Sequence, residues 1–129
     1  MKLLLDTCTI LYSTLAPGNL GEEVKRLLQL DQTEVFVSVV SAGELACGYG
    51  KRIHLDRHWK QWFRDRCEAQ RWNVLPVDLA VMEEAYSLPE PFHRDPCDRI
   101  LVATSRIHRI PLATDDRLIT AYPHVQICW

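Results

Sequence analysis

Four acidic residues that lie far apart in the sequence have surroundings in which carboxylates can do chemistry. Asp6 follows an apolar run at residues 3–5, and Glu44 lies among small and apolar residues. Asp98 and Asp116 stand near the beginnings of two later segments with helical patterns. Hard divalent cations such as Mg²⁺ take oxygen ligands, and a cation held by converging carboxylates activates water for hydrolysis. No histidine cluster or thiolate pair indicates a softer metal.

Each of these carboxylates also has a purely structural explanation. Asp6 and Asp116 precede expected helices, where Asp is a common N-cap. Asp98 lies three residues after Asp95, a spacing typical of a capping box and favourable for the helix dipole. Glu44 fits a solvated position on a helix, although a buried carboxylate is costly unless it is paired or bound to a metal. The combination favours a cation site more than any single residue does.

The elements that position these residues follow from the apolar pattern. Short apolar strands are expected at residues 3–5, 35–37, 72–77, 111–114 and 125–128. Helices are expected at 9–15, 21–30, 38 or 41 to 47, 54–70, 78–88, 95–108, and 115 or 116 to 122. This alternation predicts one α/β domain over residues 1–129, with a mainly parallel five-stranded sheet and helices on both faces. Ligands of such sheets bind beyond the carboxyl ends of the strands, which is where the acidic residues are expected.

The segments around the acids resemble those of PIN domains, in particular VapC-type toxin ribonucleases of toxin–antitoxin systems. These segments are LLLDT at 3–7, SAGEL at 41–45, DPCDRILVA at 95–103 and LATDD at 112–116. The third closely resembles the D-P-x-D-R-x-L-x-A signature of VapC proteins. In the fourth, the T-x-D pattern of the family selects Asp116 over the adjacent Asp115. The resemblance extends from Met1 to the last expected strand.

The resemblance implies a cytoplasmic metal-dependent endoribonuclease, the toxin of a VapBC-like pair. Mg²⁺, or Mn²⁺ in its place, would be held mainly by Asp6 and Asp98, with Glu44 as a ligand or as the group that orients the metal-bound water. Asp116 would complete the catalytic and metal-binding set. Supporting roles are expected for five neighbouring residues: Thr7, Thr114, Asp95, Arg99 and Asp115. Arg99 would contact phosphate or orient a carboxylate. The implied partners are an RNA substrate, a VapB-like antitoxin and a second copy in a homodimer.

Charge is unevenly distributed along the chain. The net charge is −2, which does not indicate a protein that binds nucleic acid over its whole surface. Residues 51–71, however, hold seven basic against three acidic residues, a net +4. This segment could steer RNA toward the acids or simply be a solvated helix face. Its aromatic patch of Trp59, Trp62 and Phe63 fits either the core or an anchor for the antitoxin. His54 and His58 are spaced to share one helix face.

Several other classes are disfavoured. No apolar run approaches the ~20 residues of a membrane span, and the apolar start is too short for a signal peptide. The five scattered cysteines form no CxxC pair, so buried reduced thiols are expected. A phosphoacceptor domain would need a late lysine, and none follows Lys60. A dinucleotide site lacks its GxGxxG motif. A solitary RNA-processing PIN nuclease and a catalytically silent PIN-like binding module remain open.

Overall fold

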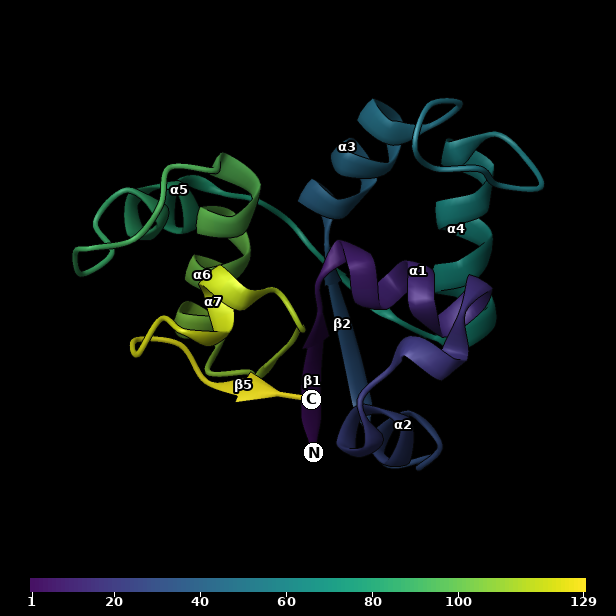
Figure 1. The fold of residues 1–129 in the computed structure, drawn as a ribbon, viewed down its shortest axis with the longest axis horizontal. Coiled ribbons are helices and arrows are strands. Elements are labelled where there is room, and N and C mark those ends of the chain that lie inside the picture. Colours follow the sequence, from purple (N-terminus) through teal and green to yellow (C-terminus); the bar gives the residue numbers. More distant parts are fainter.

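A five-stranded sheet runs through the centre of the computed structural model, which describes residues 1–129 (Figure 1). The strands are β1 (Lys2–Leu5), β2 (Glu34–Ser38), β3 (Asn73–Leu75), β4 (Leu112–Ala113) and β5 (Ile127–Cys128). Their order in the sheet is β3-β2-β1-β4-β5, and every pairing is parallel. The expected α/β architecture is confirmed, and the sheet is entirely rather than mainly parallel.

Helices cover both faces of this sheet (Figure 1). They are α1 (Thr7–Leu15), α2 (Glu22–Leu28), α3 (Val39–Gly48), α4 (Trp59–Gln70), α5 (Leu79–Ala85), α6 (Pro96–His108) and α7 (Arg117–Thr120), with a short 3₁₀ turn, η1, at Pro17–Asn19. In Figure 1, α1, α2 and α4 lie on one side of β1, while α5, α6 and α7 lie on the other. None of the helices is both long enough and apolar enough to cross a membrane.

The central strand β1 is buried on both faces, as is usual in parallel sheets. Leu3 and Leu5 pack into a core with residues of α1, α2 and α4. Leu4, which points to the opposite face, packs with residues of α6 and β4. All three leucines are fully buried. The strand is therefore held from both sides, and Asp6 directly after it has little freedom to move.

The expected helix at 54–70 begins later, at Trp59. His58 is its N-cap, and its ring nitrogen accepts from the backbone N–H of Lys60. His54 lies outside the helix, so the prediction that His54 and His58 share one helix face is wrong. Trp62 and Phe63 are buried in the core, and Trp59 is partly buried against it.

The cysteine prediction is partly wrong. All five cysteines are free thiols, but only Cys67 is buried. Cys8 and Cys47 are exposed, and Cys97 and Cys128 are intermediate.

Candidate active site

The four acidic side chains named from the sequence gather beyond the carboxyl ends of β1 and β4. These strands are neighbours in the sheet, although the chain enters them more than a hundred residues apart. The order of strands reverses between them, because the chain leaves β1 toward β2 and returns later on the other side. Open α/β sheets bind their ligands at such a switch point.

Asp6 is the most deeply buried of the acids, with 6% of its surface exposed. As N-cap of α1, its Oδ1 accepts a hydrogen bond from the backbone N–H of Thr9 at 2.7 Å. Its Oδ2 accepts a short hydrogen bond from the hydroxyl of Thr114. Burial raises the pKa of Asp6 above its ordinary value, and these hydrogen bonds offset only part of that effect.

Glu44 reaches the site from α3 and is tied to Thr7. The Thr7 hydroxyl donates to Glu44 Oε1 at 2.6 Å, and it shares a second hydrogen bond, of 2.9 Å, with the hydroxyl of Ser41. Burial raises the pKa of Glu44, with further contributions from Asp95 and Asp6. Glu44 is half-buried, between the solvated and the buried positions considered from the sequence, and its anchor Thr7 is one of the expected supporting residues.

Asp98 has the most strongly altered ionisation of the four. Burial, followed by the charges of Asp95, Asp116, Glu44 and Asp6, raises the pKa of Asp98 to about 7. The capping-box explanation does not hold for this side chain. Asp95 is the N-cap that accepts from the N–H groups of Cys97 and Asp98, while the N–H of Asp95 donates to His93 Nδ1 and not to Asp98.

Asp116 caps the short helix α7. Its Oδ1 accepts from the backbone N–H groups of Leu118 and Ile119, at 2.9 and 3.1 Å. Its own N–H donates to the Thr114 hydroxyl at 3.1 Å, so that Thr114 joins Asp116 to Asp6. The adjacent Asp115 is exposed, and its charge contributes to the raised pKa of Asp6.

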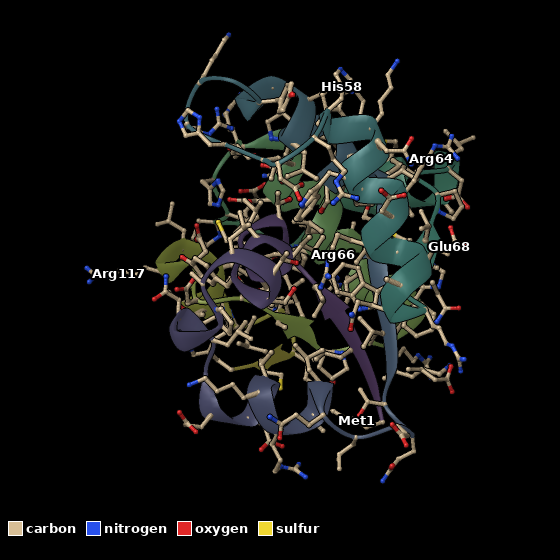
Figure 2. The ribbon with its side chains drawn as sticks, turned by 90° about the vertical axis from the view of Figure 1, so that its right-hand side faces the viewer. Met1, His58, Arg64, Arg66, Glu68 and Arg117 are labelled. Atoms are coloured by element: carbon tan, nitrogen blue, oxygen red, sulfur yellow. The ribbon has the colours of Figure 1, made fainter.

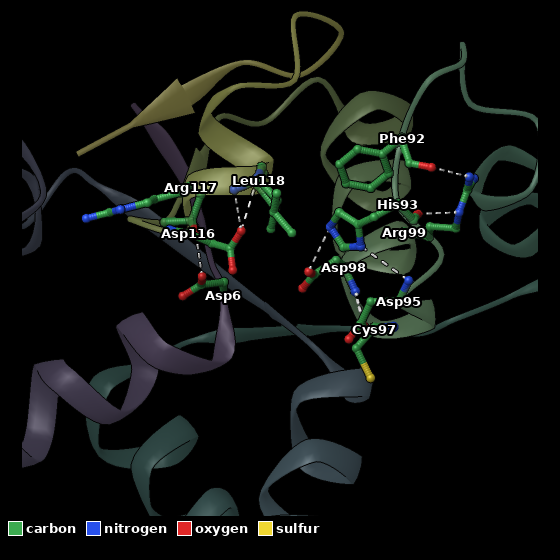
Figure 3. Close-up of polar contacts among 12 residues, drawn as sticks. Asp6, Phe92, His93, Asp95, Cys97, Asp98, Arg99, Asp116, Arg117 and Leu118 are labelled. Atoms are coloured by element: carbon green, nitrogen blue, oxygen red, sulfur yellow. Dashed lines mark hydrogen bonds and ion pairs between the residues drawn. The ribbon is translucent and has the colours of Figure 1, made fainter.

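Glu44, Asp98 and Asp116 share one arrangement, in which one oxygen has a partner in the protein and the other is available, whereas both oxygens of Asp6 accept hydrogen bonds. Oδ1 of Asp116 and Oε1 of Glu44 accept hydrogen bonds, while Oδ2 and Oε2 accept none from the protein. Oδ2 of Asp98 lies beside His93, and Oδ1 has no partner. Figure 3 shows Asp6, Asp98 and Asp116 side by side, each reaching the same region from a different element.

This donor set fits a hard divalent cation. Neither lysine nor arginine forms an ion pair with Asp6, Glu44, Asp98 or Asp116, although a buried carboxylate without a counter-charge is costly. Oxygen ligands with raised pKa values are those that a cation would stabilise in the ionised form. No three His, Cys, Asp or Glu side chains meet in one compact metal-binding group. The fit therefore rests on the raised pKa values and on the carboxylate oxygens without partners. Water molecules would have to complete the coordination shell of the ion.

Arg99 occupies a place that the sequence did not indicate. It is 6% exposed, and its guanidinium donates to Ala85 O at 2.9 Å and to His93 O at 3.0 Å. Further bonds join it to Phe92 O and to Glu90 Oε1, both at 3.2 Å. With its donors used inside the protein, Arg99 is not placed to contact a phosphate (Figure 3). It fastens the loop before α6 to α5.

The basic segment at 51–71 is mostly a solvated surface near α4. Arg57 pairs with Asp56 and Asp65. In Figure 2, Arg64 and Glu68 point away from the molecule, and Arg66 points toward its middle, where its guanidinium lies 5.7 Å from the ring centre of Trp72. Within this segment, Arg52 acts on the acids, because its charge lowers the pKa of Glu44.

One residue of the site was missed. His93 Nε2 lies 3.2 Å from Asp98 Oδ2, whereas the histidines showed no catalytic spacing in the sequence. The only available signal was its position two residues before Asp95, in the segment that leads into α6.

The fold and the site together define a single α/β domain with a carboxylate cluster at the carboxyl edge of a parallel sheet. The family model of the PIN domain matches residues 3–124. The chain therefore belongs to the PIN-domain family, and this membership supports a nuclease.

Solved structures show the same fold. VapBC2 from Rickettsia felis, bound to a DNA fragment from its promoter, matches with a TM-score of 0.72 and 13% identity over 99% of this chain and 98% of that one. DNA-bound VapBC from Salmonella typhimurium gives 0.68 and 17%, over 99% and 97%. FitAcB from Neisseria gonorrhoeae gives 0.67 and 23%, over 97% and 95%. No curated protein sequence matches the chain. At these identities the likeness concerns the fold.

Proposed function

We propose that the protein is a Mg²⁺- or Mn²⁺-dependent endoribonuclease and the toxin of a VapBC-like toxin–antitoxin pair. The observation that carries the nuclease proposal is the group of buried and half-buried carboxylates without lysine or arginine partners, beside the switch point of a PIN-domain sheet. The negative charge of such a site favours a divalent cation over a neutral ligand. A bound cation can in turn bind a phosphate group.

Asp6, Glu44, Asp98 and Asp116 would hold the cation. When bound, the ion activates a water molecule and neutralises the scissile phosphate. Asp6 cannot rotate, because Thr9 and Thr114 fix both of its oxygens. Glu44 is held at Oε1 by Thr7 and presents Oε2 to orient the attacking water. The acids fixed in this way would form a rigid frame on which substrate and water are aligned.

The direct test measures cleavage of single-stranded and structured RNA by the purified protein. Cleavage is expected with Mg²⁺ or Mn²⁺ and is expected to stop in excess EDTA. Asp98→Asn and Asp6→Asn should each reduce the rate at least ~100-fold, because each removes a charged ligand. Asp31→Asn, in an exposed turn before β2 and so at the opposite ends of the strands from the acids, serves as the control. Robust cleavage in EDTA would sink the proposal.

The same variants separate a ligand from a structural cap. Removing a repelled negative charge should leave the melting temperature of Asp98→Asn in EDTA unchanged or higher. Mg²⁺ should raise the melting temperature of the original protein but not that of the variant. A large loss of melting temperature with unchanged Mg²⁺ binding would instead make Asp98 a structural residue.

The proposed partner is an antitoxin that inserts a basic side chain among the acids. An arginine pairs bidentately with carboxylates and would exclude the cation. In support, the neighbours in the comparison include complexes named VapBC and a toxin–antitoxin complex from Klebsiella pneumoniae. Of the two roles left open for the aromatic patch, Trp62 and Phe63 take the core, so the hydrophobic anchor of this partner must lie elsewhere. Co-expression with the product of the adjacent gene tests the pairing: a co-purified pair that still cleaves RNA at full rate would contradict the blocking mechanism.

A further inference from the structure

His93 is the one side chain that contacts the Asp98 carboxylate. Its Nε2 lies 3.2 Å from Asp98 Oδ2, and the two side chains are 23% and 22% exposed. We propose that His93 is a positioning residue, which holds Oδ2 of Asp98 so that Oδ1 is available to a divalent cation. This inference rests on the metal site of the proposed function, although its test does not depend on RNA cleavage.

The hydrogen bonding of the His93 ring determines which of its two nitrogens carries the proton. His93 Nδ1 accepts a hydrogen bond from the backbone N–H of Asp95 at 3.2 Å. A ring nitrogen that accepts carries no proton, so the proton of the neutral imidazole lies on Nε2. Nε2 completes no hydrogen bond in the protein, although Asp98 Oδ2 lies 3.2 Å away. The backbone at the start of α6 therefore leaves the ring proton on the nitrogen that lies beside the carboxylate (Figure 3).

The ring itself is held by the loop that carries it. The ring of Phe92 lies 4.4 Å from that of His93 on one side and 4.4 Å from that of Tyr122 on the other. The Tyr122 hydroxyl donates to Pro89 O at 2.6 Å. Arg99, next to Asp98 in the sequence, binds the carbonyl oxygens of Phe92 and His93. One turn of α6 thus supplies both the Asp98 carboxylate and Arg99, which holds the loop that places His93 beside that carboxylate.

Asp98 needs such a partner more than the other acids do. Backbone N–H groups fix Asp6 and Asp116, and a threonine hydroxyl fixes Glu44. Asp98 accepts no hydrogen bond from backbone or hydroxyl, so without His93 its carboxylate would be free to rotate. Groups that orient a metal ligand in this way typically change metal affinity ~10–100-fold when they are removed.

The experiment measures Mn²⁺ affinity by titration calorimetry, without RNA. His93→Ala should bind Mn²⁺ about ten-fold or more weakly, and His93→Gln, which keeps an N–H donor, should recover part of the loss. His124→Ala is the matched control, because His124 also lies against this aromatic group, 5.3 Å from the Tyr122 ring, but contacts no carboxylate. Equal Mn²⁺ affinity in the original protein and His93→Ala overturns the proposal.

A second readout covers the case in which His93→Ala fails to fold. Nitrogen-15 NMR of the unaltered protein in EDTA at pH 8 should show the His93 proton on Nε2. A proton on Nδ1 overturns the proposal whatever the variants do. A protein that binds Mn²⁺ with the expected His93 dependence, yet cleaves no RNA, would refute the proposed nuclease while leaving the positioning role intact.

Discussion

Two of the four acidic side chains are structural caps and candidate ligands at the same time. Asp6 and Asp116 are N-caps of α1 and α7, as the structural explanation from sequence required. For Asp116 the cap uses only Oδ1. A cap is therefore a means of fixing a carboxylate at a helix start rather than an alternative to ligation. The same backbone N–H groups that begin the helix hold the oxygen in place.

Thr114 is expected to couple two of these acids. Thr114→Val removes the donor to Asp6 and the acceptor of the Asp116 N–H, at a fully buried position. Because buried polar groups would lose their partners, we expect a loss of ~1–3 kcal/mol in the free energy of unfolding and weaker Mn²⁺ binding. Thr120→Val is the control, since Thr120 is exposed and bonds only within α7. Urea unfolding in EDTA checks this prediction, and equal stability of both variants would contradict it.

Ionisation of Asp98 should make the metal-free protein less stable as the pH rises. The pKa of Asp98 is about 7 in the fold against 3.8 for the free side chain. The unfolded chain thus loses this proton first, and the associated stability, full below pH ~4, is lost as the pH rises to about 7. In Asp98→Asn the free energy of unfolding should change with pH by ~1–2 kcal/mol less than in the original protein, allowing for solvent screening of a partly exposed group.

Unfolding in EDTA between pH 4 and 8 measures this dependence. The pKa values of Asp6 and Glu44 are also raised, so a smaller slope of the same sign should persist in the variant. Mg²⁺ should stabilise the protein more at pH 8 than at pH 5, because it competes with fewer protons. Parallel pH profiles for the original protein and Asp98→Asn would contradict the assignment.

At the scale of elements, the sequence predicted the helix starts well where a side chain caps them. Asp95, followed by Pro96 at the first helical position, predicted α6, and Asp78 predicted α5. The start of α4 was misplaced because Leu55 continues the apolar spacing. Leu55 does pack against the core, but from a loop. Buried Ile53 likewise lies outside α4, directly after a turn in which Gly50, with φ of 74°, donates its N–H to Ile53 O.

The candidate acids and their supporting threonines could be named from the sequence, but which side chain contacts which could not. Local spacing identifies residues that follow strands or begin helices. The bond from Thr114 to Asp6 spans 108 positions and exists only because β4 inserts beside β1. The contact of His93 with Asp98 depends on the path of a loop, and that path is set by the buried Arg99. Neither contact produces a periodic pattern in the sequence.

Arg99→Ala should loosen the loop before α6 and lower stability. It leaves the carbonyl oxygens of Ala85, Phe92 and His93 without their donor in a buried place. We expect the free energy of unfolding to fall by ~2–4 kcal/mol and hydrogen exchange to become faster in residues 89–95. Arg106→Ala is the control: Arg106 also joins α6 to α5, through Glu84, but is 31% exposed. A larger loss for Arg106→Ala, or unchanged exchange in the loop for Arg99→Ala, would argue against the clamp.

For the molecule as a whole, one helix surface stands out as apolar and uncovered. On α5, Leu79, Met82 and Tyr86 follow at helical spacing and are 74, 37 and 57% exposed, with Tyr86 at the C-cap. The opposite side of α5, with Val81 and Ala85, packs on α6. An exposed apolar stripe beside a well-packed face is typical of an association surface. It is the surface we expect to be buried in the homodimer that the family resemblance implies.

Light scattering coupled to gel filtration tests this assignment. The protein is expected to be a dimer, and Leu79→Asp should shift it to monomer, because the charge would be buried in the interface. Leu118→Asp is the control, since Leu118 is similarly exposed, at 61%, but lies on α7. A dimer that is broken by Leu118→Asp and unaffected by Leu79→Asp would place the interface elsewhere.

The position of β4 beside β1 has a consequence for the synthesis of the protein. Asp6 and Glu44 leave the ribosome early, whereas Asp98 and Asp116 come from the last third of the chain. Until Ala113 has paired with Leu5, Asp116 and the threonine that fixes Asp6 are not in place. For the proposed ribonuclease, this order of translation delays activity until the catalytic domain has been almost completely made, while the growing chain is still surrounded by ribosomal and messenger RNA.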